Sequence, residues 1–278
     1  MKIQLRWQVA CVMVLSIALL VWPGTAMAVD NDQDGIDDAQ ETTGSILFNT
    51  KTYLPCGAGP LNIAQRNACL SPTSKDIFIY LVTVPGGGFI GQTSNGLSTP
   101  ELLFEFITAP REQTTTGKVN GLGVGIHVAF RTAEVPSGDR GVGTLGQKAG
   151  QIIADDSPDS FVFGVADQGT PSATGDARVF PVKIKNYVVN GGGTQLDWER
   201  FIKRTFSHEL SHVAALTAQY DSRFGGNHYA TGSGVVMDQS VVYNSRRKTF
   251  TIYDDYASGD NPCLTLVDTS NPLRCIGF

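Results

Sequence analysis

Residues 196–218, LDWERFIKRTFSHELSHVAALTA, carry the strongest helical pattern in the sequence. It contains no proline or glycine, and its large apolar side chains recur at the spacing of one helical face. We expect Asp197 or a neighbouring residue to begin the helix, after the three glycines at 191–193. The sequence therefore predicts one long helix with an apolar face, formed by Phe201, Ile202, Phe206, Val213 and Leu216.

Inside this helix, the segment HELSH places His208 and His212 four residues apart. This spacing puts both imidazoles on one helical face about one turn apart, where they can bind one zinc ion. Glu209 projects beside the same face and can act as a general base for an attacking water. Two unrelated core or surface histidines are the alternative, but the chain has only 4 His, which favours the metal interpretation.

A catalytic zinc ion usually has three protein ligands, so a third ligand must come from elsewhere. No glutamate follows Glu209 in the chain, which disfavours a downstream glutamate. His228 and aspartates such as Asp221 remain. We prefer His228, because the two glycines at 225–226 allow the chain to turn back beneath the helix. An ordinary loop histidine is the alternative for His228.

Other elements surround the long helix. The apolar, β-branched run at 76–83 predicts a buried strand, and the cap and proline at 98–100 predict the start of a helix. Residues 124–134 and 179–189 predict further strands, the second with apolar and polar side chains in alternation. His127 falls in one of these strands and is expected in the core or as an outer-sphere residue, not as a ligand. The expected fold class is α/β (α+β), with strands layered on the long helix.

An acidic loop, DNDQDGIDDAQE at residues 30–41, lies near the N-terminus. Carboxylates occupy positions 1, 3, 5, 9 and 12 and glycine occupies position 6, which is the pattern of a calcium-binding loop. The apolar residue is at position 7 and not at position 8, so the loop resembles a thrombospondin type 3 repeat and two flanking helices are not expected. A solvated acidic tail is the alternative. The expected calcium ligands are Asp30, Asp32, Asp34, Ile36, Asp38 and Glu41.

Residues 1–28 have the pattern of a signal peptide, with two cations, an apolar run from Val9 to Trp22 and an A-x-A motif ending at Ala28. Cleavage there leaves 19 Lys and Arg against 26 Asp and Glu, a formal charge of −7. We therefore expect a secreted protein, extracellular or periplasmic, that has no membrane anchor and is a monomer. This negative charge disfavours nucleic acid as a partner.

Four cysteines follow the expected cleavage point, and an even number in an exported chain indicates disulfide bonds. Three connectivities are possible. We favour Cys56 with Cys69 and Cys263 with Cys275, because each bond would close a loop that has little periodic pattern of its own. Four buried, unpaired thiols are the alternative.

A methionine nine residues after His228, Met237, makes the resemblance to a known family more specific. The HELSH segment, the later histidine and this methionine resemble the metzincin zinc metallopeptidases, in which a methionine turn runs under the zinc site. The resemblance implies a twisted mixed sheet over a central zinc-binding helix. It also implies that an edge strand, here the one ending near Val189, binds extended peptide.

The chain departs from the commonest metzincin pattern, HExxHxxGxxH. Ala215 stands in place of the glycine and Ala218 in place of the third histidine. The 15 residues between His212 and His228 are closer to long-spacer members such as leishmanolysin. Segments within the expected strands at 76–83 and 124–134 are also similar to strands of secreted bacterial metallopeptidase-like proteins.

These patterns divide the chain into a signal peptide at 1–28, a calcium motif at 29–45 and a zinc metallopeptidase domain at 46–278. The expected function is a secreted zinc-dependent endopeptidase acting on proteins or peptides, with Zn²⁺ and Ca²⁺ as cofactors. The alternative is a non-catalytic calcium-binding or adhesion protein on the same scaffold. Glu209 favours the enzyme, because a binding module has no need of a general base.

Overall fold

The computed structural model describes residues 29–32, 34–83, 100–143, 147–155, 162–166, 176–214, 228–229, 233–238, 242–244, 249–258 and 260. The expected signal peptide, the alternative ligand Asp221 and the expected pair Cys263 and Cys275 lie outside these residues.

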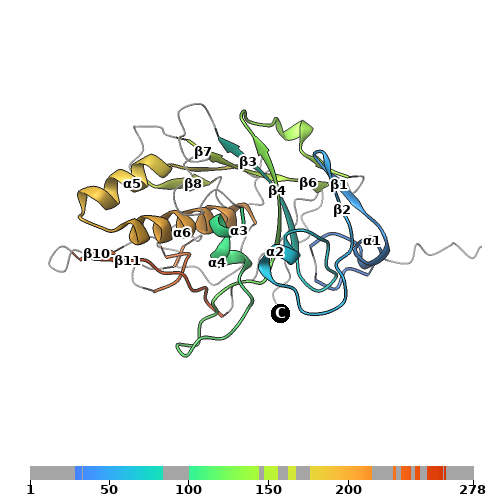
Figure 1. Cartoon of the computed structure of the whole chain (residues 1–278), viewed down its shortest axis with the longest axis horizontal. Helices are drawn as coiled ribbons and strands as arrows, with labels where there is room; N and C mark the ends of the chain where they lie inside the picture. Colours follow the sequence, from blue (N-terminus) through green and yellow to red (C-terminus); the bar gives the residue numbers. More distant parts are fainter. Residues whose placement is uncertain are drawn as a thin grey trace, which may run out of the picture.

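A five-stranded mixed sheet forms the centre of the molecule, in the order β4-β3-β7-β9-β8 (Figure 1). Neighbouring strands among the first four are parallel, and β8 runs antiparallel to β9 at one edge. The predicted strands at 76–83 and 124–134 are confirmed as β3 and as the slightly shorter β4. The strands are β3 (Asp76–Thr83), β4 (Gly125–Arg131), β7 (Gly150–Ala154), β8 (Gly164–Ala166) and β9 (Asp176–Val179).

The side chains of β3 alternate between two hydrophobic cores, as the two-residue period of a strand requires. Ile77, Ile79 and Leu81 belong to a large core that includes the long helix. Phe78 and Tyr80 belong to a second core with the N-terminal segment. Both faces of the sheet are therefore covered at β3, which explains why this strand is apolar throughout its interior.

The long helix is confirmed as α6 (Gln195–Val213). Thr194 caps it, because its hydroxyl accepts from the backbone N–H of Asp197 while the Asp197 carboxylate accepts from the backbone N–H of Thr194. The helix packs against β7, β8 and β9, and α3 (Pro100–Leu103) and α4 (Glu105–Thr108) pack on it in turn. These contacts give the predicted α/β class, a mixed sheet layered on a long helix.

The predicted strand at 179–189 is wrong, because β9 ends at Val179 and helix α5 (Pro181–Asn190) follows. Pro181 is at the first helical position, where its missing N–H costs no hydrogen bond. The buried positions of α5 are Pro181, Ile184 and Val188, which are three and four residues apart and so mark a helix. Figure 1 shows α5 beside α6.

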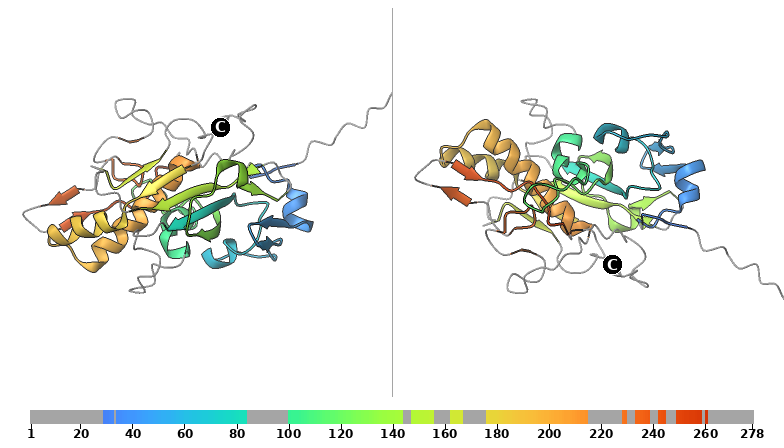
Figure 2. Two further views of the ribbon diagram at one scale, coloured as in Figure 1. Left: turned by 90° about the horizontal axis from the view of Figure 1, so that it is seen from above. Right: turned by 90° about the horizontal axis from the view of Figure 1, so that it is seen from below.

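The N-terminal segment covers the other face of β3. It contains α1 (Asp38–Thr43), the hairpin of β1 (Ile46–Phe48) and β2 (Lys51–Tyr53), and α2 (Ile63–Arg66). The expected disulfide between Cys56 and Cys69 is confirmed. Both views in Figure 2 place α1 at the opposite end of the molecule from α5 and the start of α6.

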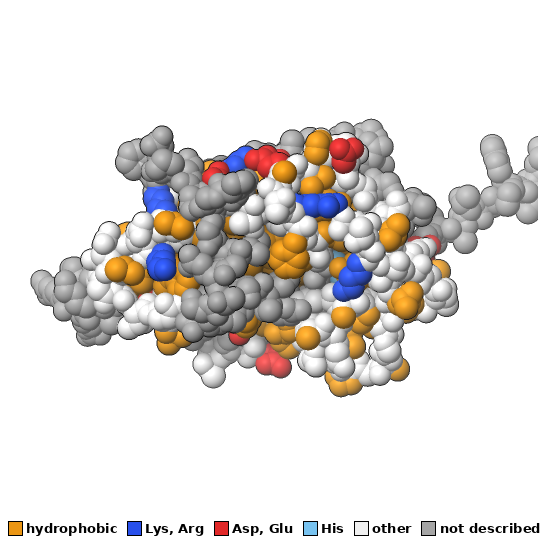
Figure 3. All heavy atoms as spheres, turned by 45° about the horizontal axis from the view of Figure 1, so that its top comes forward, with side chains coloured by type: hydrophobic (Ala, Val, Ile, Leu, Met, Phe, Trp, Pro, Cys, Tyr) orange, Lys and Arg blue, Asp and Glu red, His pale blue; other side chains and the backbone are white. Residues whose placement is uncertain are grey.

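The remaining described elements are short. They are a 3₁₀ turn (Ser137–Asp139), β5 (Gly141–Val142), β6 (Gln147–Lys148), β10 (Val242–Asn244) and β11 (Thr249–Thr251). Among the described helices, none has the length and apolar character needed to cross a membrane. On the face in Figure 3, the coloured Lys and Arg side chains stand apart from one another, and one near the top lies beside acidic side chains.

Candidate metal centre

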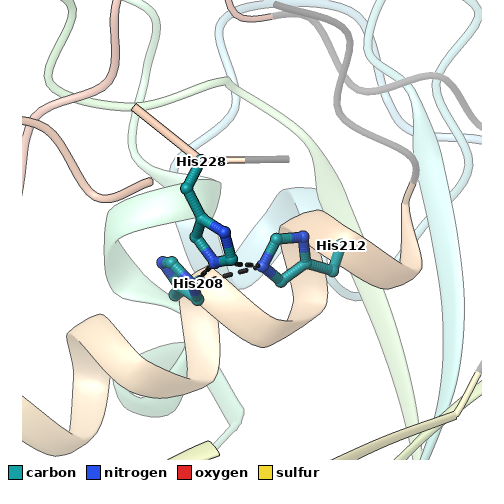
Figure 4. Close-up of side chains that lie close together, drawn as sticks. All are labelled: His208, His212 and His228. Carbon is teal, nitrogen blue, oxygen red and sulfur yellow. Dashed lines mark hydrogen bonds between the residues drawn. The ribbon is translucent and has the colours of Figure 1, made fainter. Parts of the chain in front are cut away.

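Helix α6 presents His208 and His212 from consecutive turns, and His228 approaches them from outside the helix (Figure 4). His208 and His228 are buried and His212 is partly exposed. The structure therefore brings together the three histidines that the sequence suggests as zinc ligands.

The three Nε2 atoms form a nearly equilateral triangle. Their separations are 3.2 Å between His208 and His212, 3.1 Å between His212 and His228, and 3.1 Å between His228 and His208. Three nitrogens that each lie about 2.0–2.1 Å from a tetrahedral zinc ion are about 3.3 Å apart. The side chains present thus fit a His₃ zinc site without rearrangement.

The tautomer of His208 suits metal binding. Its Nδ1 lies 2.8 Å from the backbone carbonyl of Val236, which can only accept a hydrogen bond. Nδ1 therefore carries the proton, and the Nε2 of the neutral ring keeps a free lone pair directed into the triangle. An outer-sphere contact of this kind fixes the orientation of a metal-binding histidine.

The turn that contains Val236 also contains Met237, and it contacts the segments of two of the histidines. Val236 accepts from His208, while the carbonyl of Met237 accepts from the backbone N–H of Tyr229, the residue after His228. The side chain of Met237 is fully buried in the large core. This turn therefore connects the helix with the segment of the third histidine.

Burial keeps the imidazoles of His208 and His212 neutral at physiological pH. It lowers the pKa of His212 to about 3 and holds that of His208 well below 6.5, with further lowering from neighbouring cationic groups. One of these is Arg204, which is buried one turn before His208 and donates to the backbone carbonyl of Asp238. Neutral imidazole is the form that binds a metal ion.

Glu209 lies between the helix and the edge of the sheet. Its carboxylate is so close to the backbone of β8 that a Cβ atom placed on Gly164 would be 2.4 Å from Oε1. Burial raises the pKa of Glu209 to about 8, although the Arg204 charge lowers it in part. Glu209 follows His208 in the helix, and a carboxyl group at that position is a candidate to accept and return a proton.

The acidic loop folds into a cluster of carboxylates. Asp30, Asp32 and Asp34 offer oxygens within 4.8 Å of one another, and Asp34 and Glu41 form a second such group with Asp76. Burial and neighbouring carboxylates raise the pKa of Asp32 to about 7 and that of Asp34 to about 8. The loop therefore brings four of its expected calcium ligands close together.

One expected calcium ligand, Asp38, lies outside the described cluster. Its two oxygens accept from the backbone and side-chain amides of Asn31. Ile36 buries its side chain in the second core, while its backbone N–H donates to Asp34 Oδ1. Asp76, the first residue of β3, takes part in the cluster instead and was not expected from the sequence.

His127 lies far from the three-histidine triangle in the fold, on the face of β4 that packs against the second core. It contacts Phe78 and Tyr53, and its Nε2 is 2.9 Å from Asp76 Oδ1. His127 is fully buried, as expected for a core residue, and its polar contact belongs to the carboxylate cluster.

No family model and no curated protein sequence matches this chain. Among solved structures, archaemetzincin from Methanopyrus kandleri is similar with a TM-score of 0.33 and 16% sequence identity, over 66% of this chain and 89% of that protein. A TM-score of this size is too low to bear on the function of the chain.

Proposed function

We propose that the chain is a secreted zinc-dependent endopeptidase with His208, His212 and His228 as zinc ligands and Glu209 as general base. The observation that carries the proposal is the triangle of three Nε2 atoms with sides of 3.1–3.2 Å; Glu209, buried and next to His208 in the same helix, supports it. Three neutral nitrogen ligands are the set that several catalytic zinc enzymes use.

A zinc ion held by these histidines would act as a Lewis acid that polarises the scissile carbonyl and acidifies water. Glu209 accepts the proton of the attacking water and then donates it to the leaving amine. The ionised carboxylate accepts the proton, and burial, which raises the pKa of Glu209, stabilises the protonated form that donates it afterwards. Val236 and the Met237 turn keep the histidines in place during these steps.

Strand β8 supports a peptide as the substrate. It is the last strand of the sheet, and within the described residues it pairs with β9 only. An extended peptide can add to such an edge through backbone hydrogen bonds. Because Gly164 brings this edge to the Glu209 carboxylate, a peptide bound there would pass the general base. This strand replaces the segment ending near Val189, which is helical, as the expected binding edge.

We include secretion in the proposal because residues 1–28 have the pattern of a signal peptide. The confirmed disulfide between Cys56 and Cys69 supports it, because such bonds persist in oxidising compartments.

The alternative is a non-catalytic binding protein that keeps the metallopeptidase scaffold. The burial of Glu209 disfavours this alternative. Burying a carboxylate costs free energy, and a binding protein has no need of the general base that would justify this cost. A glutamine would fill the same space without the charge.

The test compares purified wild type with Glu209→Gln, which keeps the size of the side chain and removes the base. We expect about one zinc per chain in both proteins by mass spectrometry, and hydrolysis of casein or gelatin by the wild type alone. Zinc in both proteins without hydrolysis by either would support the binding scaffold. A wild type that holds no zinc would overturn the metal centre.

A further inference from the structure

The carboxylate cluster lies on the opposite face of β3 from the three histidines. Asp76 precedes Phe78 and Tyr80 on the face that packs against the N-terminal segment, whereas the α6 core lies against Ile77 and Ile79. The cluster therefore has no part in the proposed peptidase chemistry, and its charge requires a separate explanation.

Glu41 provides the strongest indication of a ligand. Its side chain has an exposed fraction of 0%, and neither carboxylate oxygen has a hydrogen-bond partner. Both oxygens of Asp32 are also buried. A carboxylate removed from water without a donor or a cation is strongly unfavourable. Such groups directed into a cluster of further carboxylates indicate that a cation belongs between them.

Among the described residues, the nearby cationic groups give the Glu41 oxygens no hydrogen bond. Lys75 lies near the loop aspartates, and His127 contacts Asp76. Five carboxylates meet here, from Asp30, Asp32, Asp34, Glu41 and Asp76. The excess of negative charge and the purely oxygen ligands are typical of a site for a hard divalent cation.

We propose that a calcium ion binds between the N-terminal loop and the central sheet, with Asp76 of β3 as a ligand in place of Asp38. Calcium accepts six to eight oxygens in flexible geometry, which suits several carboxylates supplied by a loop and a strand. Magnesium requires a regular octahedron and keeps several waters, so it suits this crowded cluster less well. Asp76, which belongs to β3 and not to the loop, thus completes the set of ligands that the loop begins.

This calcium ion attaches the N-terminal segment to the sheet. The segment already contacts the start of β3, because the backbone N–H of Asp76 donates to Asp34 Oδ2 at 2.7 Å. Ile36, between the ligands Asp34 and Glu41, is fully buried in the second core. Loss of the cation would leave the carboxylates to repel one another under this core, and the segment would separate from the sheet more readily.

The test measures calcium affinity by isothermal titration calorimetry on the full secreted chain with its zinc, after gel filtration into calcium-free buffer. Asp76→Asn is the informative variant and Asp38→Asn is the matched control, because both remove one carboxylate charge from the same region. We expect Asp76→Asn to weaken calcium binding at least about tenfold and Asp38→Asn to change it less than about threefold. Magnesium should bind more weakly than calcium to the wild type.

Glu41→Gln provides a second variant, because Asp76→Asn also loses a partner of His127 and can affect folding. Circular dichroism and zinc content identify any variant that is misfolded. Glu41→Gln should likewise weaken calcium binding at least about tenfold. The proposal is overturned by equal losses in Asp38→Asn and Asp76→Asn, by unchanged affinity in both Asp76→Asn and Glu41→Gln, or by a wild type that binds no calcium at about 1 mM. None of these outcomes depends on peptidase activity.

Discussion

Gly164→Ala is a change of one methyl group that should inactivate the proposed enzyme without removing its metal. The added Cβ would lie 2.4 Å from Glu209 Oε1 and 2.7 Å from Cδ and Cγ of the same side chain. Ordinary contacts of a Cβ atom begin near 3.4 Å, so the carboxylate must move by about 1 Å. The backbone of Gly164 does not have a positive φ, and alanine is therefore compatible with the strand.

The expected loss follows from the position of the general base. A displacement of about 1 Å in a catalytic group can reduce the rate about 100-fold, which corresponds to about 2.7 kcal/mol of transition-state stabilisation. The loss should appear in kcat, because the displaced group acts on the reaction and the peptide edge of β8 keeps its backbone hydrogen bonds. Zinc content should stay at one per chain, because the three atoms nearest to the added Cβ all belong to Glu209 and not to a histidine.

The assay is hydrolysis of a quenched fluorescent peptide, with kcat and KM determined separately and zinc measured on the same samples. Gly138→Ala is the matched control, because a Cβ there meets nothing within 4 Å. In a Glu209→Gln background, Gly164→Ala should cause no further loss, since the group it displaces is already inactive. A Gly164→Ala enzyme with zinc bound and kcat within about threefold of wild type would refute this role of the edge strand.

Two further predictions concern the third histidine and a buried carboxylate. His228→Ala should lower zinc affinity by more than about 100-fold, which is the largest loss expected from an outer-sphere contact. The control His127→Ala should keep its zinc and lose only thermal stability. Full zinc occupancy of His228→Ala in competition with a chelator would contradict the ligand assignment. Burial raises the pKa of Asp260 from 3.8 to about 6, so its ionisation opposes folding, and this carboxyl's contribution to stability is complete below pH 3.8 and is lost as the pH rises through about 6. Asp260→Asn can still accept from the Tyr229 hydroxyl and should therefore gain up to about 3 kcal/mol over wild type between pH 4 and pH 7 in urea unfolding; parallel pH profiles of the two proteins would show that the prediction is wrong.

The parts of the fold that depend on local sequence could be predicted. Helix α6 has a continuous apolar face and a capping box, and β3 is a β-branched run, so each carries its own signal. Strand β8 has three residues and no such signal, and its place at the sheet edge depends on pairing with β9. The helix α5 was missed because Val182 and Ile184 suggested alternation, although Pro181 indicated a helical start.

In the candidate metal centre, too, the contacts within one element could be predicted and the contacts between elements could not. His208, Glu209 and His212 belong to one helix, so their spacing alone predicts that they are close together. His228 could be chosen over Asp221 only from its glycine-rich surroundings, and its approach to the triangle depends on the Met237 turn. The contact between Glu209 and Gly164 joins two elements 45 positions apart, and neither sequence segment contains a sign of it.

The register of β3 decides which face of the sheet receives each charge. In the sequence DIFIYLVT, Asp76 stands at the start of an apolar run, where a polar residue usually marks only the boundary of a strand. Because side chains alternate, the register that directs Ile77 and Ile79 into the large core also directs Asp76 toward Asp34 and Glu41. A slip of one residue would place this carboxylate on the α6 face and leave the loop without its partner. The packing of the large core therefore determines the geometry of the cation cluster on the other face, and the two candidate metal sites depend on the same strand.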